Sequence, residues 1–368
     1  MARRKSEQET REFELLMEKL PLFPDYVQKY IHYRKSKLTT GTLSNYLIDF
    51  RFFFEWLIEE GIHDGSIHNV PLSCLETLSL EKANRFREIL KDSFEDSTTN
   101  RRLSALKSLF NYLSQIAEDD EGFALMKRNV MAKIELVEMK ESKKYRAKKI
   151  QQAILQVTPE RNEILEFIEH VKSGHRAKIV GNKRLLDNYE KNMERDLAAI
   201  ALCLDSGIRA FELVALNVQD IQFSDNSIMV RRGKGNKKDI IYFGDLAYVY
   251  LKDYLAVREG RYAIPKDFPP LFVSSGTGPK GKPDRMTKRN LQYIVERYAK
   301  TFDKSSLTVH KLRHSFASAF YQKNNNIIML KEQLRHESTQ TTEIYTHVNN
   351  QALREAVVRT NDIELNEK

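Results

Sequence analysis

The sequence has few cysteines and no long apolar run, features on which secreted, zinc-stabilised or membrane-spanning proteins depend. Two cysteines, Cys74 and Cys203, occur in 368 residues, too few for a disulfide framework or a cysteine-based zinc cluster. The longest apolar run, LAAIALCL (197–204), ends after eight residues, whereas a membrane-spanning helix needs roughly 20. The charged start, MARRKSEQETRE, has no apolar signal-peptide core. These absences predict a cytoplasmic protein with no membrane span and two inert core thiols.

Charge and composition indicate a globular, basic chain. There are 60 Lys and Arg against 51 Asp and Glu, a formal net charge of +9. Such an excess favours a polyanionic partner such as nucleic acid, but many basic proteins bind none. The hydrophobic content is 41%, enough for a sizeable core, and domains usually have about 100–200 residues. We therefore expect two domains.

The amino-terminal part has helical periodicity and few strand signals. Apolar residues recur at helical spacing through LSNYLIDFRFFFEWLI (43–58). A second amphipathic helix is expected in DSTTNRRLSALKSLFNYLSQI (96–116), with Ser97 or Thr98 as its N-cap. Residues 1–135 are predicted to form an all-α domain.

The second of these helices also carries basic residues. Arg101, Arg102 and Lys107 are expected opposite its apolar stripe, where they could contact phosphates or a DNA groove. The alternative is a solvated charged face with no ligand.

A basic linker is expected after this domain, over residues 136–157. Within it, KESKKYRAKK (140–149) holds six Lys and Arg against one Glu and has no apolar periodicity. It is either a solvated charge run or a tether whose Lys143 and Lys144 follow DNA phosphates.

The second half predicts a mixed α and β domain, mainly helical, over residues 158–350. ERDLAAIALCLDSGIRAFELVAL (194–216) indicates a helix, a break at Gly207 and another helix. SIMVRRGKGNKKDIIYF (227–243) indicates a β-hairpin with a basic tip. The tail, residues 351–368, contains an amphipathic stretch that is expected either to dock on a neighbouring protomer or to pack on its own domain.

No cofactor is expected. GTGPKGKP (276–283) approaches a nucleotide-binding P-loop, but it has Pro283 where Mg²⁺ binding needs a Ser or Thr hydroxyl. We interpret it as a surface loop. The nine histidines include no H-E-x-x-H zinc motif, so no metal site is predicted.

Two cations of the second half suit an anionic ligand. Arg209 follows the Gly207 break at the head of a helix, where a guanidinium and the helix N-terminus both attract an anion. Lys234 lies between two glycines at the expected hairpin tip. Considered singly, each is more often a plain surface residue.

Further along the chain, imidazole and guanidinium groups recur at meaningful spacing. His310 and Arg313 are three residues apart and share a face of a helix, an arrangement suited to a phosphate, whereas His314 is expected to face elsewhere. His336 precedes Tyr345 by nine residues. Each feature alone also fits an ordinary surface helix or a core aromatic.

In combination, these residues resemble a known family. Four segments carry them, in the order SGIRAFELVAL (206–216), GKGNKK (233–238), HKLRHSFAS (310–318) and IYTHV (344–348). This ordered set is similar to that of the tyrosine recombinase (phage integrase) family. The two amino-terminal helices resemble its SAM-like core-binding domain. KRNVMAKIEL (127–136) and LDNYEKNMERDLAAIAL (186–202) are similar to Xer-type members that resolve chromosome dimers in streptococci and their relatives.

The resemblance implies a role for each residue. Tyr345 would attack a DNA phosphodiester and form a 3′-phosphotyrosyl link, without metal or ATP. Arg209 and Arg313 would clamp the phosphate, and Lys234 would protonate the leaving 5′ oxygen. His310 would assist proton transfer at the tyrosine, and His336 would hydrogen-bond the scissile phosphate.

Two positions depart from the family pattern. Arg335 stands where the family usually has glycine, in Leu334-Arg335-His336, and Asp239 stands where it more often has a basic residue. Neither is expected to abolish the chemistry, although Arg335 puts the local geometry in question.

The resemblance also implies partners and leaves alternatives open. The expected partners are double-stranded DNA with a specific recombination site, three further copies in a homotetramer on two sites, and a DNA translocase of the FtsK type. The expected process is DNA recombination for chromosome partition at cell division, at a dif-like site. Alternatives are a mobile-element integrase, a type IB topoisomerase-like nicking enzyme, or a relative that binds DNA but has lost catalysis.

Overall fold

In a computed structural model of the chain, two compact units are separated at residue 140. The structure describes residues 7–138, 150–231, 238–274, 283–336 and 342. The units span Met1–Lys140 and Glu141–Lys368. The predicted linker crosses this boundary, and its residues 139–149 lie outside the described part. The predicted domain bounds stay a prediction.

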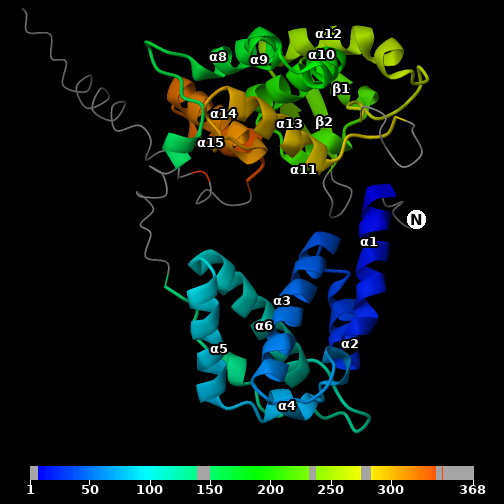
Figure 1. Ribbon diagram of the computed structural model, residues 1–368, viewed down its shortest axis with the longest axis vertical. Helices are drawn as coiled ribbons and strands as arrows, with labels where there is room; N and C mark the ends of the chain where they lie inside the picture. Colours follow the sequence, from blue (N-terminus) through cyan, green and yellow to red (C-terminus); the bar gives the residue numbers. More distant parts are fainter. Residues whose placement is uncertain (1–6, 139–149, 232–237, 275–282, 337–341, 343–368) are drawn as a thin grey trace, which may run out of the picture. The chain divides into compact units, whose positions relative to one another are not determined.

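The regular elements among the described residues of the first unit are all helices, as the sequence predicts (Figure 1). Its longer helices are α1 (Glu7–Lys19), α2 (Asp25–Arg34), α3 (Thr40–Glu59), α5 (Leu80–Ser93) and α6 (Asp96–Gln115). The short elements between and after them are η1 (Leu20–Leu22), η2 (Ile67–Asn69), α4 (Leu72–Glu76) and η3 (Val130–Lys133).

The core of the first unit follows from the apolar stripe of α3. Thr39 caps this helix, since its hydroxyl accepts the backbone N–H of Thr42. The inward face is fully buried and rich in phenylalanine, at Phe50, Phe53 and Phe54. The rings of Phe53 and Phe86 meet edge to face with centroids 5.2 Å apart, which joins α3 to α5.

The second helix begins earlier than the sequence predicted. Neither Ser97 nor Thr98 is the N-cap of α6. The cap position is Glu95, whose side chain makes no capping hydrogen bond. Ser97 and Thr98 lie inside the first turn, because Glu95 already has the extended backbone of a cap residue.

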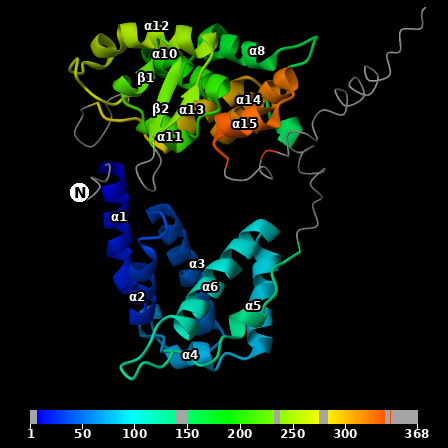
Figure 2. The same cartoon turned by 180° about the vertical axis from the view of Figure 1, so that it is seen from behind.

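The second unit is mixed, with helices around a small sheet (Figures 1 and 2). Its first helices are α8 (Glu163–Glu169), the π-helical η4 (His170–Gly174), α9 (His175–Ile179), α10 (Lys183–Ser206) and α11 (Ala210–Ala215). The sheet region comprises η5 (Val218–Asp220), β1 (Ile221–Gln222), β2 (Ser227–Arg231) and β3 (Lys238–Tyr242). The remaining helices are α12 (Asp245–Tyr262), α13 (Lys288–Thr301), α14 (Val309–Asn324) and α15 (Ile327–Leu334).

Helix α10 is the central element of this unit. It packs against α12 and α14 and is buried almost continuously through its last turns. Both views show α12 beside it (Figures 1 and 2). The sheet is antiparallel in the order β1-β2-β3, and the register pairs Val230 with Asp239 across the hairpin. The predicted hairpin is thus confirmed, while its tip, residues 232–237, lies outside the described part.

An isolated antiparallel bridge joins Val273 to Arg285. The predicted surface loop falls mostly on residues 275–282, outside the described part. Across the described residues, every helix is too short or too polar to cross a bilayer.

A buried imidazole in the second unit makes its stability sensitive to acid. His175 is 2% exposed and its Nδ1 lies 2.7 Å from the Thr301 hydroxyl, which donates to the Tyr298 carbonyl. Burial lowers the pKa of His175 to about 4. In the unfolded chain the pKa of a histidine is about 6.5. As the pH falls from 6.5 towards 4, the unfolded state therefore takes up a proton that the folded state does not.

We therefore expect the free energy of unfolding of the second unit to fall with acidification through that window, and His175→Gln to remove part of this slope. Urea unfolding followed by far-UV circular dichroism measures it. Fluorescence of Trp56, the single tryptophan, reports the first unit and serves as the internal control. An unchanged slope in His175→Gln would contradict the assignment.

Candidate active site

The site is built on the break between α10 and α11. Gly207 follows α10 with φ 66°, in the left-handed region that glycine occupies without strain. A Cβ at this position would lie 2.5 Å from Phe316 Cδ1 and 2.8 Å from Leu334 Cδ2. Glycine therefore lets the break approach α14 and α15 closely. The predicted break is confirmed.

Arg313 on α14 joins this break to the end of α15. Its side chain is buried, and its guanidinium donates to the carbonyls of Gly207 and, at 2.7 Å, of Leu334. Its Nη2 also lies 3.1 Å from His336 Nε2. Because a buried cation is costly unless its donors are satisfied, these contacts fix the guanidinium in one orientation.

Arg209 meets the same segment from the other side. It occupies the N-cap position of α11, and its guanidinium donates to the Arg335 carbonyl at 3.1 Å. Its Nη1 donates to Glu212 Oε1 at 3.3 Å, and its backbone N–H donates to Glu212 Oε2 at 3.0 Å. The side chain of Arg209 is 32% exposed. Arg209 and Arg313 therefore bond to consecutive carbonyls, 335 and 334.

The contacts of His336 define its tautomer. A guanidinium can only donate, so Nε2 accepts from Arg313 and the ring hydrogen is on Nδ1. Nδ1 lies 3.0 Å from the hydroxyl of Thr342. Burial, Arg313 and Arg209 lower the pKa of His336 to about 4, so the imidazole is neutral at pH 7.

His310 lies one turn before Arg313 on α14, as predicted. Burial and the neighbouring Arg313 and Arg209 lower its pKa. Its ring meets that of His314 edge to face, with centroids 4.5 Å apart. The expectation that His314 faces elsewhere is therefore wrong, because residues four apart on a helix are neighbours.

Arg335 occupies a conformation that glycine would adopt with less strain. With φ 52° and ψ 51°, it closes α15: its N–H donates to the Glu332 carbonyl, and the His336 N–H donates to the Lys331 carbonyl. This pair of backbone hydrogen bonds is a Schellman motif. Placing a residue other than glycine in its left-handed position costs about 1 kcal/mol of stability. The side chain is buried and forms an ion pair with Glu212. The family's glycine thus has a backbone reason, and Arg335 keeps the same backbone.

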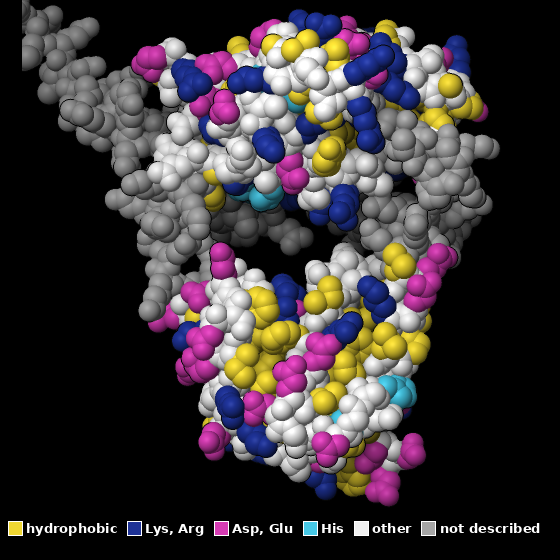
Figure 3. All heavy atoms as spheres, in the orientation of Figure 1, with side chains coloured by type: hydrophobic (Ala, Val, Ile, Leu, Met, Phe, Trp, Pro, Cys, Tyr) yellow, Lys and Arg dark blue, Asp and Glu magenta, His cyan; other side chains and the backbone are white. Residues whose placement is uncertain are grey.

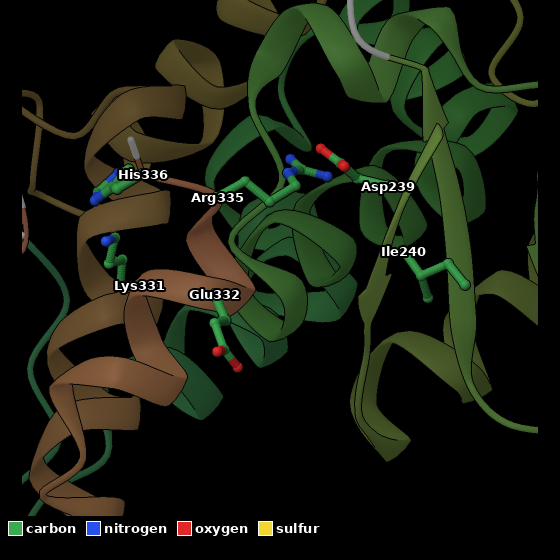
Figure 4. A pocket seen from close by; sticks show the side chains of 6 residues that line it. All are labelled: Asp239, Ile240, Lys331, Glu332, Arg335 and His336. Carbon is green, nitrogen blue, oxygen red and sulfur yellow. The ribbon is translucent and has the colours of Figure 1, made fainter. Parts of the chain in front are cut away.

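A cavity of about 310 Å³ opens beside this residue (Figure 4). The six residues that line it come from β3 and the end of α15: Asp239, Ile240, Lys331, Glu332, Arg335 and His336. In Figure 4 the guanidinium of Arg335 and the carboxylate of Asp239 point toward one another.

The hairpin is fastened to α15 next to His336. The Gln333 side chain donates to the Tyr242 carbonyl at 2.7 Å and accepts the Tyr242 N–H at 3.3 Å. The same amide donates to the Ser206 carbonyl at 2.9 Å. Lys234 and Tyr345 lie outside the described residues, so their roles stay predictions.

The first unit places its predicted DNA-binding residues unequally. Arg102 is buried, with its guanidinium 4.6 Å from the ring centroid of Phe52 and 4.3 Å from that of Phe94. The expectation that it lies opposite the apolar stripe is wrong, because cation–π contacts hold it in the core. Arg101 is exposed and pairs with buried Asp49.

Lys107 is half-buried, and Lys143 and Lys144 lie outside the described residues. On the described part of the viewed face, Lys and Arg side chains are interspersed with acidic and apolar ones (Figure 3). Charge alone therefore does not mark a DNA-binding surface there, and contacts by Arg101 and Lys107 stay predictions.

Three residues of the site were not anticipated from the sequence. Glu212 has a local signal, since it stands three residues after Arg209 at a helix start, the spacing at which a side chain reaches the N-cap backbone. Thr342 lies near His336 in the sequence but has no recognisable motif, and Gln333 has no local signal because its partner, the hairpin backbone, is brought near only by the fold.

Comparisons with known proteins agree with this arrangement. The model of the phage integrase family matches residues 181–352. Tyrosine recombinase XerS of Streptococcus mutans is 36% identical over 94% of this chain and 98% of that protein. XerS of Streptococcus agalactiae is 35% identical over the same shares.

Solved structures share the fold at low identity. The XerH site-specific recombinase bound to a palindromic difH substrate aligns with a TM-score of 0.62 and 20% identity, over 92% of this chain and 95% of that one. A lambda integrase dimer bound to a COC′ core site aligns with a TM-score of 0.54 and 15% identity, over 87% and 93%. The predicted fold class is confirmed.

Gly207→Ala is expected to destabilise the second unit by about 2–4 kcal/mol, since it adds both a backbone strain and an overpacked methyl group. Urea unfolding followed by circular dichroism measures this. Gly260→Ala is the matched control, because a Cβ at Gly260 in α12 meets nothing within 4 Å. Equal effects of the two substitutions would contradict the close approach.

Arg102→Ala is expected to lower the free energy of unfolding of the first unit by about 2 kcal/mol, through lost cation–π contacts and a weakened partner set for buried Asp49. Trp56 fluorescence during urea unfolding measures it. Lys107→Ala should change stability by less than about 0.5 kcal/mol and instead weaken DNA binding with a smaller salt dependence. A stable Arg102→Ala with weakened DNA binding would reverse the assignment.

Proposed function

The chain belongs to the phage integrase family of tyrosine recombinases, and we propose that Tyr345 is the nucleophile with which it cuts and rejoins DNA. The chain is a site-specific DNA recombinase. What remains to be assigned is which residues act and at which DNA site.

The convergence of two guanidinium groups on one turn of backbone carries the proposal. Arg209 and Arg313 come from α11 and α14, and both donate to the 334–335 carbonyls while His336 follows directly. Such a cluster concentrates positive charge where a phosphodiester needs charge neutralised in its transition state.

The proposed reaction exchanges one phosphoester bond for another. The Tyr345 oxygen attacks phosphorus, the bond from phosphorus to the 5′ oxygen breaks, and the 3′ phosphate stays on the tyrosine. The phenol loses a proton and the departing 5′ oxygen gains one from Lys234. Attack by the free 5′ hydroxyl of a partner strand reverses the sequence, so no high-energy cofactor is consumed.

The histidines suit proton handling because both are neutral at pH 7. Neutral His310 can accept the phenol proton, which a protonated imidazole cannot. His336 can donate to a phosphate only from a nitrogen that carries hydrogen. An adjacent phosphate raises the pKa of an imidazole, which favours a proton on Nε2 once DNA replaces the contact with Arg313.

The biological setting follows from the relatives. XerS proteins are similar over 94% of the chain, and the XerH structure contains a difH substrate. We propose a dif-like chromosomal site, a homotetramer on two such sites, and control by a DNA translocase. A mobile-element integrase remains the second candidate, supported by the likeness to lambda integrase.

Covalent capture on DNA tests the assignment. Purified protein is mixed with nicked duplexes from the host's replication terminus, without metal or nucleotide, and adducts that resist denaturation are measured. We expect adducts from the wild type and none from Tyr345→Phe, which lacks the nucleophilic oxygen. Adducts from Tyr345→Phe would transfer the role to another residue.

Lys234→Ala separates the acid from the nucleophile on the same substrates. Cleavage should fall sharply with an ordinary 5′ oxygen and recover when a 5′ sulfur leaves, because a thiolate departs without a proton. Failure of the sulfur substrate to restore cleavage would remove Lys234 from the acid role.

A further inference from the structure

We propose that Arg335 is a positioning residue: its guanidinium neutralises Glu212 and so keeps Arg209 available for the scissile phosphate. This inference rests on the proposed function, since it concerns a residue of that site. It gives a chemical role to a position that departs from the family pattern.

The first step is that one carboxylate serves two guanidinium groups. Glu212 is 4% exposed and pairs with Arg335 through Oε2 and with Arg209 through Oε1, the latter at 3.3 Å. Its Oε2 also accepts the Arg209 backbone N–H at 3.0 Å. The pairing is unequal, because the contact with Arg335 is the shorter of the two.

The second step is electrostatic competition. A buried carboxylate attracts any cation beside it more strongly as other partners are removed, because the low dielectric leaves its charge poorly screened. Without Arg335, Arg209 would be the remaining guanidinium on Glu212 among the described residues. Its Nη1 would be drawn into a full ion pair that a phosphate must then displace.

The third step is that the Arg335 side chain is buried between two acidic residues. It is 5% exposed, and in the described part of the chain its Nε and Nη1 have no hydrogen-bond partner. Burial, the largest effect, lowers the pKa of the Arg335 guanidinium, and Arg209 lowers it further, while Glu212 and Asp239 partly oppose the shift. Figure 4 shows the guanidinium directed at Asp239 on β3. Two carboxylates therefore offset part of the cost of burying this cation between α11 and the hairpin.

The backbone of Arg335 adds a second link to the same arginine. Its carbonyl accepts from Arg209 Nη2 at 3.1 Å, so the left-handed conformation that closes α15 also presents this acceptor. Arg335 thus acts on Arg209 twice, by its carbonyl directly and by its side chain through Glu212. Only the second action depends on the side chain, and substitutions can isolate it.

The test measures single-turnover cleavage of a nicked trapping duplex at saturating DNA, with DNA affinity measured separately. Arg335→Met removes the charge, and we expect the cleavage rate constant to fall 10- to 100-fold while the Kd changes less than 3-fold. Arg335→Lys should retain most of the rate. Lys323→Met, which removes an exposed charge from the last turn of α14 outside this cavity, is the matched control and should change the rate constant less than 3-fold.

The double variant Glu212→Gln/Arg335→Met is decisive. A neutral amide no longer competes for Arg209, so we expect the rate constant to rise at least 5-fold above that of Arg335→Met. A purely structural role for the ion pair predicts no recovery, since the double variant lacks both charges. No recovery would overturn the proposal.

Arg335→Gly keeps the inference falsifiable should Arg335→Met not fold. Glycine suits the left-handed backbone, so a role limited to helix closure predicts a stable variant that cleaves at the wild-type rate, and that outcome would overturn the proposal. A slowed Arg335→Gly with normal DNA affinity would support it. If the wild type itself formed no adduct, the proposed function would fail instead, which separates the two.

Discussion

The buried guanidinium of Arg313 joins two segments that are far apart in the sequence. It bonds the Gly207 carbonyl at the end of α10, the Leu334 carbonyl at the end of α15 and the ring of His336. Each of those carbonyls is at a helix end, where backbone acceptors lack intrahelical partners. The arginine satisfies them and is satisfied by them. The same contacts therefore fix both the position of the helix ends and the placement of the positive charge of Arg313.

This arrangement concentrates like charge in a small volume. Arg209, Arg313 and Arg335 surround a turn of backbone, and Glu212 is the buried anion among them. Two unit charges about 4 Å apart repel by roughly 4 kcal/mol at an effective dielectric near 20, so a cluster of like charges favours an anionic partner. Burial first, and then Arg313 and Arg209, lower the pKa values of His310 and His336.

The sequence predicted what periodicity and special residues can specify. The stripe of α3, the hairpin and the break at Gly207 each have a local signal, namely apolar spacing, β-branched runs around a glycine turn, and a glycine between helices. It failed where a side chain's direction depends on a distant partner. Arg102 is charged and next to exposed Arg101, yet Phe52 and Phe94 from other elements hold it in the core. Gln333 gives no local signal either, since its partner Tyr242 is 91 residues away in the sequence.

The two departures from the family pattern can be explained only once the fold is known. Arg335 and Asp239 are 96 residues apart in the sequence and carry opposite charges, and each alone is an oddity. In the fold they line one cavity, beside the amide of Gln333 that fastens the hairpin to α15. A charge added at the end of α15 would be costly beside Arg209 and Arg313 unless anions accompanied it. Glu212 and Asp239 supply them, and Asp239 does so from the strand that leads away from Lys234. The end of β3 and the guanidinium groups of Arg209 and Arg313 therefore all bond to the same end of α15.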